Sequence, residues 1–155
     1  MTYIRQLRQL VGTRPLVLAG ACALVMDARG SLLMLRRTDN GCWGIPGGAL
    51  EPGESTEQTV RRETLEETSL TLGPLELFGV FSGPELFYHY PNGDQVYNVT
   101  IAYTCSSYTG SIACSDGEHD RYAFFQLSAL PANTSPSIQP ILKALLDARA
   151  RWPII

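Results

Sequence analysis

Three glutamates in one predicted helix are the residues of this sequence best placed to do chemistry. Glu63, Glu66 and Glu67 stand at positions i, i+3 and i+4, so a helix would bring their carboxylates together on one face. Like charges at this spacing repel one another. A hard divalent cation such as Mg²⁺ would relieve the repulsion, because it binds carboxylate oxygens and is commonly held against substrate phosphates. The spacing therefore indicates a candidate metal site.

The segment before these glutamates carries the signals of a helix start. Residues 48–54 read Gly-Ala-Leu-Glu-Pro-Gly-Glu, which is typical of a loop. Ser55 is the expected N-cap, and Gln58, three residues later, completes the pattern of a capping box. We therefore predict a helix that begins at Ser55, with Glu54 directly before it.

The stretch 48–70 resembles the Nudix box, G-x5-E-x7-R-E-U-x-E-E-x-G-U, in which U is a bulky aliphatic residue. The matching positions are Gly48, Glu54, Arg62, Glu63, Glu66, Glu67 and Leu70. Residues 43–47, Trp-Gly-Ile-Pro-Gly, precede the box as they do in many members of the Nudix hydrolase family. The alternative is a solvated acidic helix face, and the number of matching positions favours the family.

Two positions depart from the box. Thr64 stands where an aliphatic residue is expected, and we predict that its hydroxyl donates a hydrogen bond to the carbonyl of Val60. Ser69 replaces a glycine at the end of the helix, where a left-handed conformation would cost serine about 1–2 kcal/mol more than glycine. Both departures bear on stability, and neither belongs to the charged set.

The resemblance implies a role for each charged position of the box. Glu63, Glu66 and Glu67 would be the main metal ligands, joined by the backbone carbonyl of Gly48, and would hold one to three Mg²⁺ or Mn²⁺ ions. Arg62 would orient the carboxylates, and Glu54 would hold Arg62 or a water outside the ligand shell. We count Glu66, Glu67 and Arg62 among the residues that carry catalysis.

The family also implies a further acid from a loop after the box, and we choose Glu118 because it lies just before an aromatic strand. It would be a metal ligand or the catalytic base. Asp116 and Asp120 are neighbours that could replace it, and a solvated loop acid is the alternative interpretation. We assign neither His89 nor His119 to a metal, because no second ligand stands at a zinc-like spacing.

The substrate-binding residues are predicted from residue type and position. Arg37, at the end of a predicted strand, could reach a phosphate, and Trp43 and Tyr88 could stack on a nucleobase. The alternatives are an exposed strand end and ordinary core aromatics. Tyr88 is near a tyrosine position of dinucleoside polyphosphate hydrolases, and Pro84 is near a proline position of ADP-ribose hydrolases. These two weak marks conflict, so the substrate stays open.

The function implied is divalent-metal-dependent hydrolysis of a pyrophosphate in a nucleoside diphosphate linked to another moiety. The substrate could be a nucleotide sugar, ADP-ribose, a dinucleoside polyphosphate or a nucleoside triphosphate. The resemblance is to the MutT-like and ADP-ribose pyrophosphatase-like members of the family. One rival is a catalytically weak sensor of nucleotides or metabolites with the same fold. Another is a structural role through the terminal helices. The complete set of box carboxylates favours the enzyme.

Composition points to one globular domain over residues 1–155, with 45% hydrophobic and 17% charged residues. The net charge of −3, with no basic block, argues against non-specific binding of nucleic acid. The first residues lack the apolar core of a signal peptide, and the apolar run 15–26 is too short to span a bilayer. We therefore expect a cytoplasmic protein with a nucleotide-type substrate and no membrane partner.

The remaining pattern predicts helices at both ends of the chain and strands between them. An amphipathic helix at 2–11 should pack on the domain or on a second subunit, which would make a homodimer, and a second amphipathic helix is expected at 137–149. Predicted strands cover 16–26, 31–37, 72–81, 86–90, 95–103, 110–113 and 121–127, with a hairpin turn at Asn92-Gly93. The family resemblance implies an α/β (α+β) fold, an α/β/α sandwich with a mixed central sheet.

Overall fold

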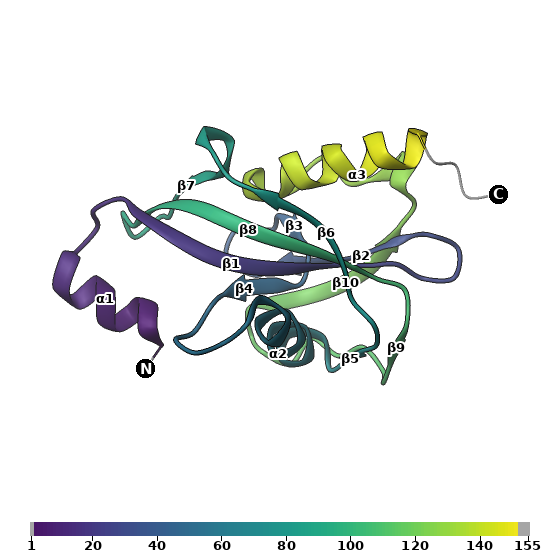
Figure 1. Ribbon diagram of the computed structural model, residues 1–155, viewed down its shortest axis with the longest axis horizontal. Coiled ribbons are helices and arrows are strands. Elements are labelled where there is room, and N and C mark those ends of the chain that lie inside the picture. The colour runs from purple at the N-terminus through teal and green to yellow at the C-terminus, as the bar shows by residue number, and fades with distance from the viewer. Residues whose placement is uncertain (1, 152–155) are drawn as a thin grey trace.

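The chain folds as an α/β/α sandwich in a computed structural model that describes residues 2–151 (Figure 1). Helix α2 (Thr56–Thr68) lies on one side of the central strands, and helix α3 (Gln139–Arg151) lies on the other. The short helix α1 (Tyr3–Val11) lies beside the start of the first strand. Among the described residues, no helix is both long enough and apolar enough to cross a membrane.

The larger sheet is mixed and is built around β1 (Leu16–Val25). This strand pairs in parallel with β8 (Gln95–Cys105) and antiparallel with the short β4 (Gly47–Ala49). Two further strands, β6 (Glu76–Phe81) and β7 (Phe87–His89), pair antiparallel with β8. The predicted mixed central sheet is therefore confirmed.

Two smaller sheets complete the strand layer. One is antiparallel, with β2 (Leu32–Arg37) between β10 (His119–Phe125) and β3 (Trp43–Gly44). The other pairs β5 (Thr71–Leu72) with β9 (Tyr108–Thr109). Three short 3₁₀ turns lie at Pro84–Leu86, Leu127–Ala129 and Pro136–Ile138.

The second half of β1 is buried on both faces, which explains its continuous apolar sequence. Ala21, Ala23 and Val25 belong to a core that also contains Val60 of α2. The alternate residues, Cys22 and Leu24, belong to a second core that contains Ile141, Leu142 and Leu145 of α3. β1 thus joins the two helix layers, and it also positions β4 at the start of the box.

Most predicted elements are present with small shifts of their ends. The capping box is confirmed: Ser55 accepts from the amide of Gln58 at 3.2 Å, and the Gln58 side chain accepts from the amide of Ser55 at 2.8 Å. The hairpin at residues 92–93 is confirmed between β7 and β8. The C-terminal helix begins at Gln139 instead of 137, because a 3₁₀ turn precedes it.

The strand predicted at 110–113 is wrong. The strand in this region is β9, at Tyr108–Thr109, and it pairs with β5. Residues 110–113 run instead beside the end of α2, where the amide of Ala113 donates to the carbonyl of Thr68 at 3.0 Å. The chain here closes the helix end, so its apolar residues do not indicate a strand.

The hydrogen bond predicted for Thr64 is also absent. Thr64 is fully buried, and its hydroxyl has no hydrogen-bond partner among residues 2–151. Thr68, one turn later, does bond back along the helix to the carbonyl of Thr64. Thr64 therefore presents an unpaired polar atom at the position where the box expects an aliphatic residue.

Replacing Thr64 by valine should stabilise the protein. Thr64→Val keeps the shape of the side chain and removes the unpaired hydroxyl, so the free energy of unfolding should rise by about 1 kcal/mol. Urea denaturation measures the change. Thr68→Val is the matched control and should destabilise, because it removes a bonded hydroxyl. A Thr64→Val protein that unfolds at lower urea than its parent would contradict this account.

Ser69 adopts the predicted left-handed conformation at the end of α2, with φ 63° and ψ 12°. A serine in this conformation should make the protein less stable than a glycine would. Glycine adopts this conformation without strain, so Ser69→Gly should stabilise by about 1 kcal/mol and raise the melting temperature by roughly 2–4 °C. Ser69→Ala, which keeps a Cβ, should give no such gain. If the glycine variant melts at or below the temperature of the parent, strain at this position is not limiting.

Candidate active site

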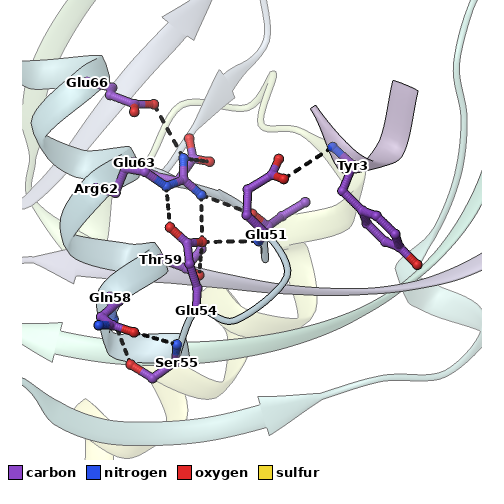
Figure 2. Close-up of polar contacts among 10 residues, drawn as sticks. Tyr3, Glu51, Glu54, Ser55, Gln58, Thr59, Arg62, Glu63 and Glu66 are labelled. Carbon is purple, nitrogen blue, oxygen red and sulfur yellow. Dashed lines mark hydrogen bonds and ion pairs between the residues drawn. The ribbon is translucent and has the colours of Figure 1, made fainter. Parts of the chain in front are cut away.

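Arg62 is the centre of the charged face of α2 (Figure 2). Its Nε and Nη2 atoms donate to the two oxygens of Glu54 at 2.6 and 2.9 Å. Its Nη1 atom donates to Glu63 at 2.7 Å and, more weakly, to Glu66 at 3.4 Å. One guanidinium thus contacts three carboxylates, and its charge offsets part of their mutual repulsion.

Glu54 is held by several donors besides Arg62. Its Oε2 atom accepts from the hydroxyl of Thr59 at 2.8 Å and from the amide of Glu51 at 3.1 Å. The hydrogen bonds from Arg62, above all, lower the pKa of the Glu54 carboxyl to about 2. With both oxygens bonded, Glu54 is placed to hold Arg62, as the resemblance implies.

Glu67 is the most buried acid of the helix, with 8% of its surface exposed. Its Oε2 atom accepts one hydrogen bond, from the amide of Gly47 at 3.0 Å. Burial raises the pKa of the Glu67 carboxyl to about 9, because a single neutral donor does not replace the lost water. Burial also raises the pKa of Glu63, despite the opposing effect of Arg62. These two carboxylates lack sufficient positive charge around them.

Gly48 allows the Glu63 carboxylate to lie against the backbone of β4. A Cβ atom at position 48 would collide with that carboxylate. Gly20 of β1, which pairs with Ala49, leaves room in the same way, since a Cβ there would come within 2.9 Å of the Gly48 carbonyl oxygen. The missing Cβ atoms thus leave space around Gly48 for the Glu63 carboxylate on one side and for β1 on the other.

A second set of polar groups comes from the loop before β10. Asp116 accepts from the amides of Glu118 and His119 at 3.0 and 3.1 Å, and its other oxygen lies 2.9 Å from the His119 ring. The candidate ligand atoms of Glu67, Asp116 and His119 all lie within 4.8 Å of one another. This grouping adds donors from a different element, at the buried end of the carboxylate face.

Sequence reasoning considered His119 only for a zinc-like spacing and kept Asp116 as an alternative to Glu118. In the structure, Asp116 shapes the loop through three hydrogen bonds and brings the His119 ring to Glu67. The i, i+3 spacing of Asp116 and His119 was the available signal. This spacing is common in turns and does not by itself predict a ligand site. The two side chains reach Glu67 because β10 pairs with β2 and places the loop beside α2.

The other acids of this loop differ in their surroundings. Glu118 is exposed, and its backbone carbonyl accepts from the amide of Thr38 at 2.9 Å. The charge of Glu118, after the larger effect of burial, contributes to the raised pKa values of Glu63 and Glu67. Asp120, in contrast, forms a bidentate pair with Arg36 at 2.9 and 2.5 Å.

A cavity of about 390 Å³ opens beside Glu67, the acid of α2 that lines it. Its size suits a small-molecule ligand. Gly48, Glu67 and His119 line one part of it, and further lining comes from residues 18–22 of β1 and from alternate residues of β8. Ile4 and Arg8 of α1 line another part.

Of the three predicted substrate-binding residues, Arg37 lines this cavity, and Trp43 and Tyr88 are not among its lining residues. Arg37 lines it, although its guanidinium is paired with Asp39 at 2.9 and 2.7 Å. Trp43 packs edge-on against Phe125, with ring centroids 4.9 Å apart, and is not among the residues that line the cavity. We therefore give Trp43 a packing role.

Tyr88 also lies outside the set of lining residues. Its ring contacts Tyr90 edge-on at 4.6 Å, and its hydroxyl lies 3.3 Å from the side-chain amide of Asn40. Tyr90 does line the cavity. The ring that reaches the cavity is therefore that of Tyr90, two residues after the Tyr88 that sequence reasoning chose.

Comparison with protein families matches residues 17–145 to the NUDIX domain. A MutT-like protein of Streptomyces ambofaciens is 43% identical over 67 residues, which cover 43% of this chain and 44% of that protein. An ADP-ribose pyrophosphatase of Methanocaldococcus jannaschii is 31% identical over 110 residues, which cover 69% of this chain and 61% of that protein. The matches thus span less than two thirds of these relatives' own lengths.

Solved structures show the same architecture over a longer stretch. The MutT NUDIX hydrolase from Burkholderia pseudomallei superposes with a TM-score of 0.72 at 25% identity, covering 84% of this chain and 98% of that one. An Ap4A hydrolase from Caenorhabditis elegans superposes with a TM-score of 0.67 at 20% identity, covering 87% and 99%. The second likeness bears on the fold alone.

The buried Glu67 should make the metal-free protein less stable as pH rises. In an unfolded chain the carboxyl ionises near its ordinary pKa of 4.5, whereas the folded protein holds the proton up to a pKa of about 9. The stabilisation from that proton is therefore complete below about pH 4.5 and is lost as pH rises towards about 9. Glu67→Gln cannot ionise, so it should lose less stability over this range, as urea denaturation in chelator would measure.

Glu57→Gln is the control for this experiment, because Glu57 is an exposed acid of the same helix. Adding Mg²⁺ should stabilise the parent most at alkaline pH, since a carboxylate must lose its proton to bind a cation. The same addition should stabilise Glu67→Gln less. Parallel pH profiles for the parent, Glu57→Gln and Glu67→Gln would show that Glu67 is not the proton-holding group.

Proposed function

Because this chain belongs to the Nudix domain family, we propose that it is a divalent-metal-dependent hydrolase of the pyrophosphate in a nucleoside diphosphate linked to another moiety. One observation carries the proposal. Burial raises the pKa values of two carboxylates of α2: Glu67, which lines a ligand-sized cavity, and Glu63, which lies against the backbone of Gly48, another residue that lines it. Such a site has oxygen donors in excess of positive charge.

The donor set fits Mg²⁺ or Mn²⁺, which prefer oxygen ligands. Glu63, Glu66 and Glu67 would hold one to three ions together with the carbonyl of Gly48, and Glu118 would join them from the loop before β10. Asp116 and His119 extend the same set on the buried side. Bound there, the metal would neutralise phosphate charge and lower the pKa of a water molecule.

The protein groups have separate tasks in this proposal. Arg62 is a positioning residue: it contacts Glu54, Glu63 and Glu66, and so holds the ligand set in one arrangement. Glu118 is an exposed acid of the loop before β10, and in this proposal it accepts a proton from the attacking water as the new P–O bond forms. Arg37 offers its charge to a phosphate on the cavity wall.

Two relatives carry names that state a substrate, an ADP-ribose pyrophosphatase and a putative 8-oxo-dGTP diphosphatase, and both names describe a phosphoanhydride attached to a nucleoside. They support a nucleotide substrate of this general type. Attack of water on one phosphorus would break the bridging P–O bond. The products would be a nucleoside monophosphate and a second phosphorylated product.

A panel of nucleoside diphosphate derivatives with Mg²⁺ or Mn²⁺ tests the proposal, with the products separated by chromatography. Glu67→Gln should lower kcat by about a hundredfold or more on the preferred substrate, because the site loses a negative ligand that stabilises the transition state. Glu57→Gln should keep the activity of the parent. Activity of Glu67→Gln within about threefold of the parent would falsify this assignment.

Glu118→Gln should also lower kcat, and Asp120→Asn is its control because Arg36 already occupies that carboxylate. If Glu118 is the base, its replacement should in addition flatten the part of the pH–rate profile that depends on a deprotonated group. Loss of activity in Asp120→Asn but not in Glu118→Gln would move the role to another acid of this loop.

A further inference from the structure

Helix α1 supplies part of the cavity wall although it lies outside the family match, which begins at Val17. Ile4 and Arg8 of α1 line the cavity together with Asp94 from the turn between β7 and β8. The part of the cavity wall that α1 forms therefore lies outside the matched family domain. Such an addition next to a ligand cavity is a candidate for substrate selection.

Polar contacts at both ends hold α1 in place. At its start, the amide of Tyr3 donates to Glu51 of the box loop at 3.2 Å (Figure 2). Arg8 donates to the carbonyls of Gly12, Arg14 and Gln95 at 2.9, 2.6 and 2.8 Å. No residue of α1 is buried, and a nine-residue helix is marginal alone in water, so these contacts fix the helix at the cavity.

Arg8 and Asp94 form an incompletely paired group at this end. The Nε atom of Arg8 is buried without a hydrogen-bond partner among residues 2–151, and it lies 3.5 Å from Oδ1 of Asp94. The other oxygen of Asp94 accepts from the side-chain amide of Asn92 at 3.0 Å. Oδ1 accepts no hydrogen bond within the described part of the chain, and the Asp94 side chain keeps 24% of its surface exposed. One carboxylate oxygen is thus available to a ligand.

The strand register separates this group from the acids of α2. Arg8 bonds to Gln95 at the start of β8, whereas Gly48 pairs with Ala21, which in turn pairs with Ile101. Six residues of strand span about 20 Å. A pyrophosphate bound at the carboxylates therefore lies far from Asp94, and the group that reaches Asp94 belongs to the remote part of the substrate.

We propose that α1 and Asp94 form a specificity element for that remote part. Asp94 accepts a hydrogen bond from a neutral donor, either a sugar hydroxyl or an exocyclic amine of a base, and Arg8 is the positioning residue that holds α1 and the 91–94 turn in place. The carboxylate also disfavours a further phosphate at this end, so it selects against substrates with one there. The inference rests on the proposed function for the identity of the ligand.

Steady-state kinetics on the preferred substrate provide the first test. Arg8→Met and Asp94→Asn should each raise KM by about tenfold and leave kcat within about threefold, because the carboxylate site is untouched. Arg5→Met is the matched control: Arg5 is an exposed residue of the same helix and does not line the cavity. Equal KM values for Arg8→Met, Asp94→Asn and Arg5→Met would overturn the proposal.

A binding experiment distinguishes a sugar hydroxyl from an exocyclic amine as the donor to Asp94. Calorimetry measures the affinity of non-hydrolysable α,β-methylene nucleoside diphosphates in the presence of Mg²⁺. If a sugar hydroxyl is read, the 2′-deoxy or 3′-deoxy adenosine analogue should bind the parent about tenfold more weakly, and the loss should vanish in Asp94→Asn. If an amine is read, the inosine analogue should behave in this way. Equal affinity of the parent for all four analogues would refute a contact at Asp94.

The binding measurement also keeps the inference apart from the proposed function. A parent that binds the analogues but hydrolyses nothing in the panel would defeat the hydrolase proposal, while α1 would still be tested by Asp94→Asn. A parent that hydrolyses the substrate with the same KM in every α1 and turn variant would defeat the inference alone. Should Arg8→Met fail to fold, Asp94→Asn decides the outcome.

Discussion

Two carboxylates on one face of α2, Glu67 buried and Glu63 half-buried, determine much of what surrounds them. Glu63 and Glu67 lose water when the strands cover the helix, and the protein returns to them one guanidinium contact and one backbone amide. That is too little to stabilise two negative charges in a low-dielectric site. Arg62 and the bare backbone at Gly48 are what allow these acids to lie close together despite their shared charge.

The local structure of the box could be predicted from the chain because its signals are local. Ser55 and Gln58 form a capping box with few alternatives, and the glutamate spacing on a helix fixes which side chains share a face. The left-handed serine followed from the position of a missing glycine. Signals of this kind depend on neighbours within about one helical turn, so tertiary contacts do not override them.

What could not be predicted depends on pairings between distant strands. The Asp116–His119 pair reaches Glu67 only because β10 lies against β2, and Tyr90 lines the cavity in place of Tyr88 because of how the β7–β8 hairpin sits. Trp43 was assigned to substrate by residue type, but its contact with Phe125 is decided by the second sheet. The prediction for Thr64 was wrong for another reason. Helix geometry allows its hydroxyl to donate to the carbonyl of Val60, but the buried hydroxyl does not form that hydrogen bond.

The parallel pairing of β1 with β8 has a consequence for the order in which the protein folds. Paired residues of these strands are 80 positions apart, so a long loop must close before the larger sheet exists. During synthesis α2 emerges well before β8 and β10, and its acidic face stays hydrated until they do. The repulsion among the glutamates therefore acts on the closing step. A divalent cation bound as proposed would relieve that repulsion and speed the step.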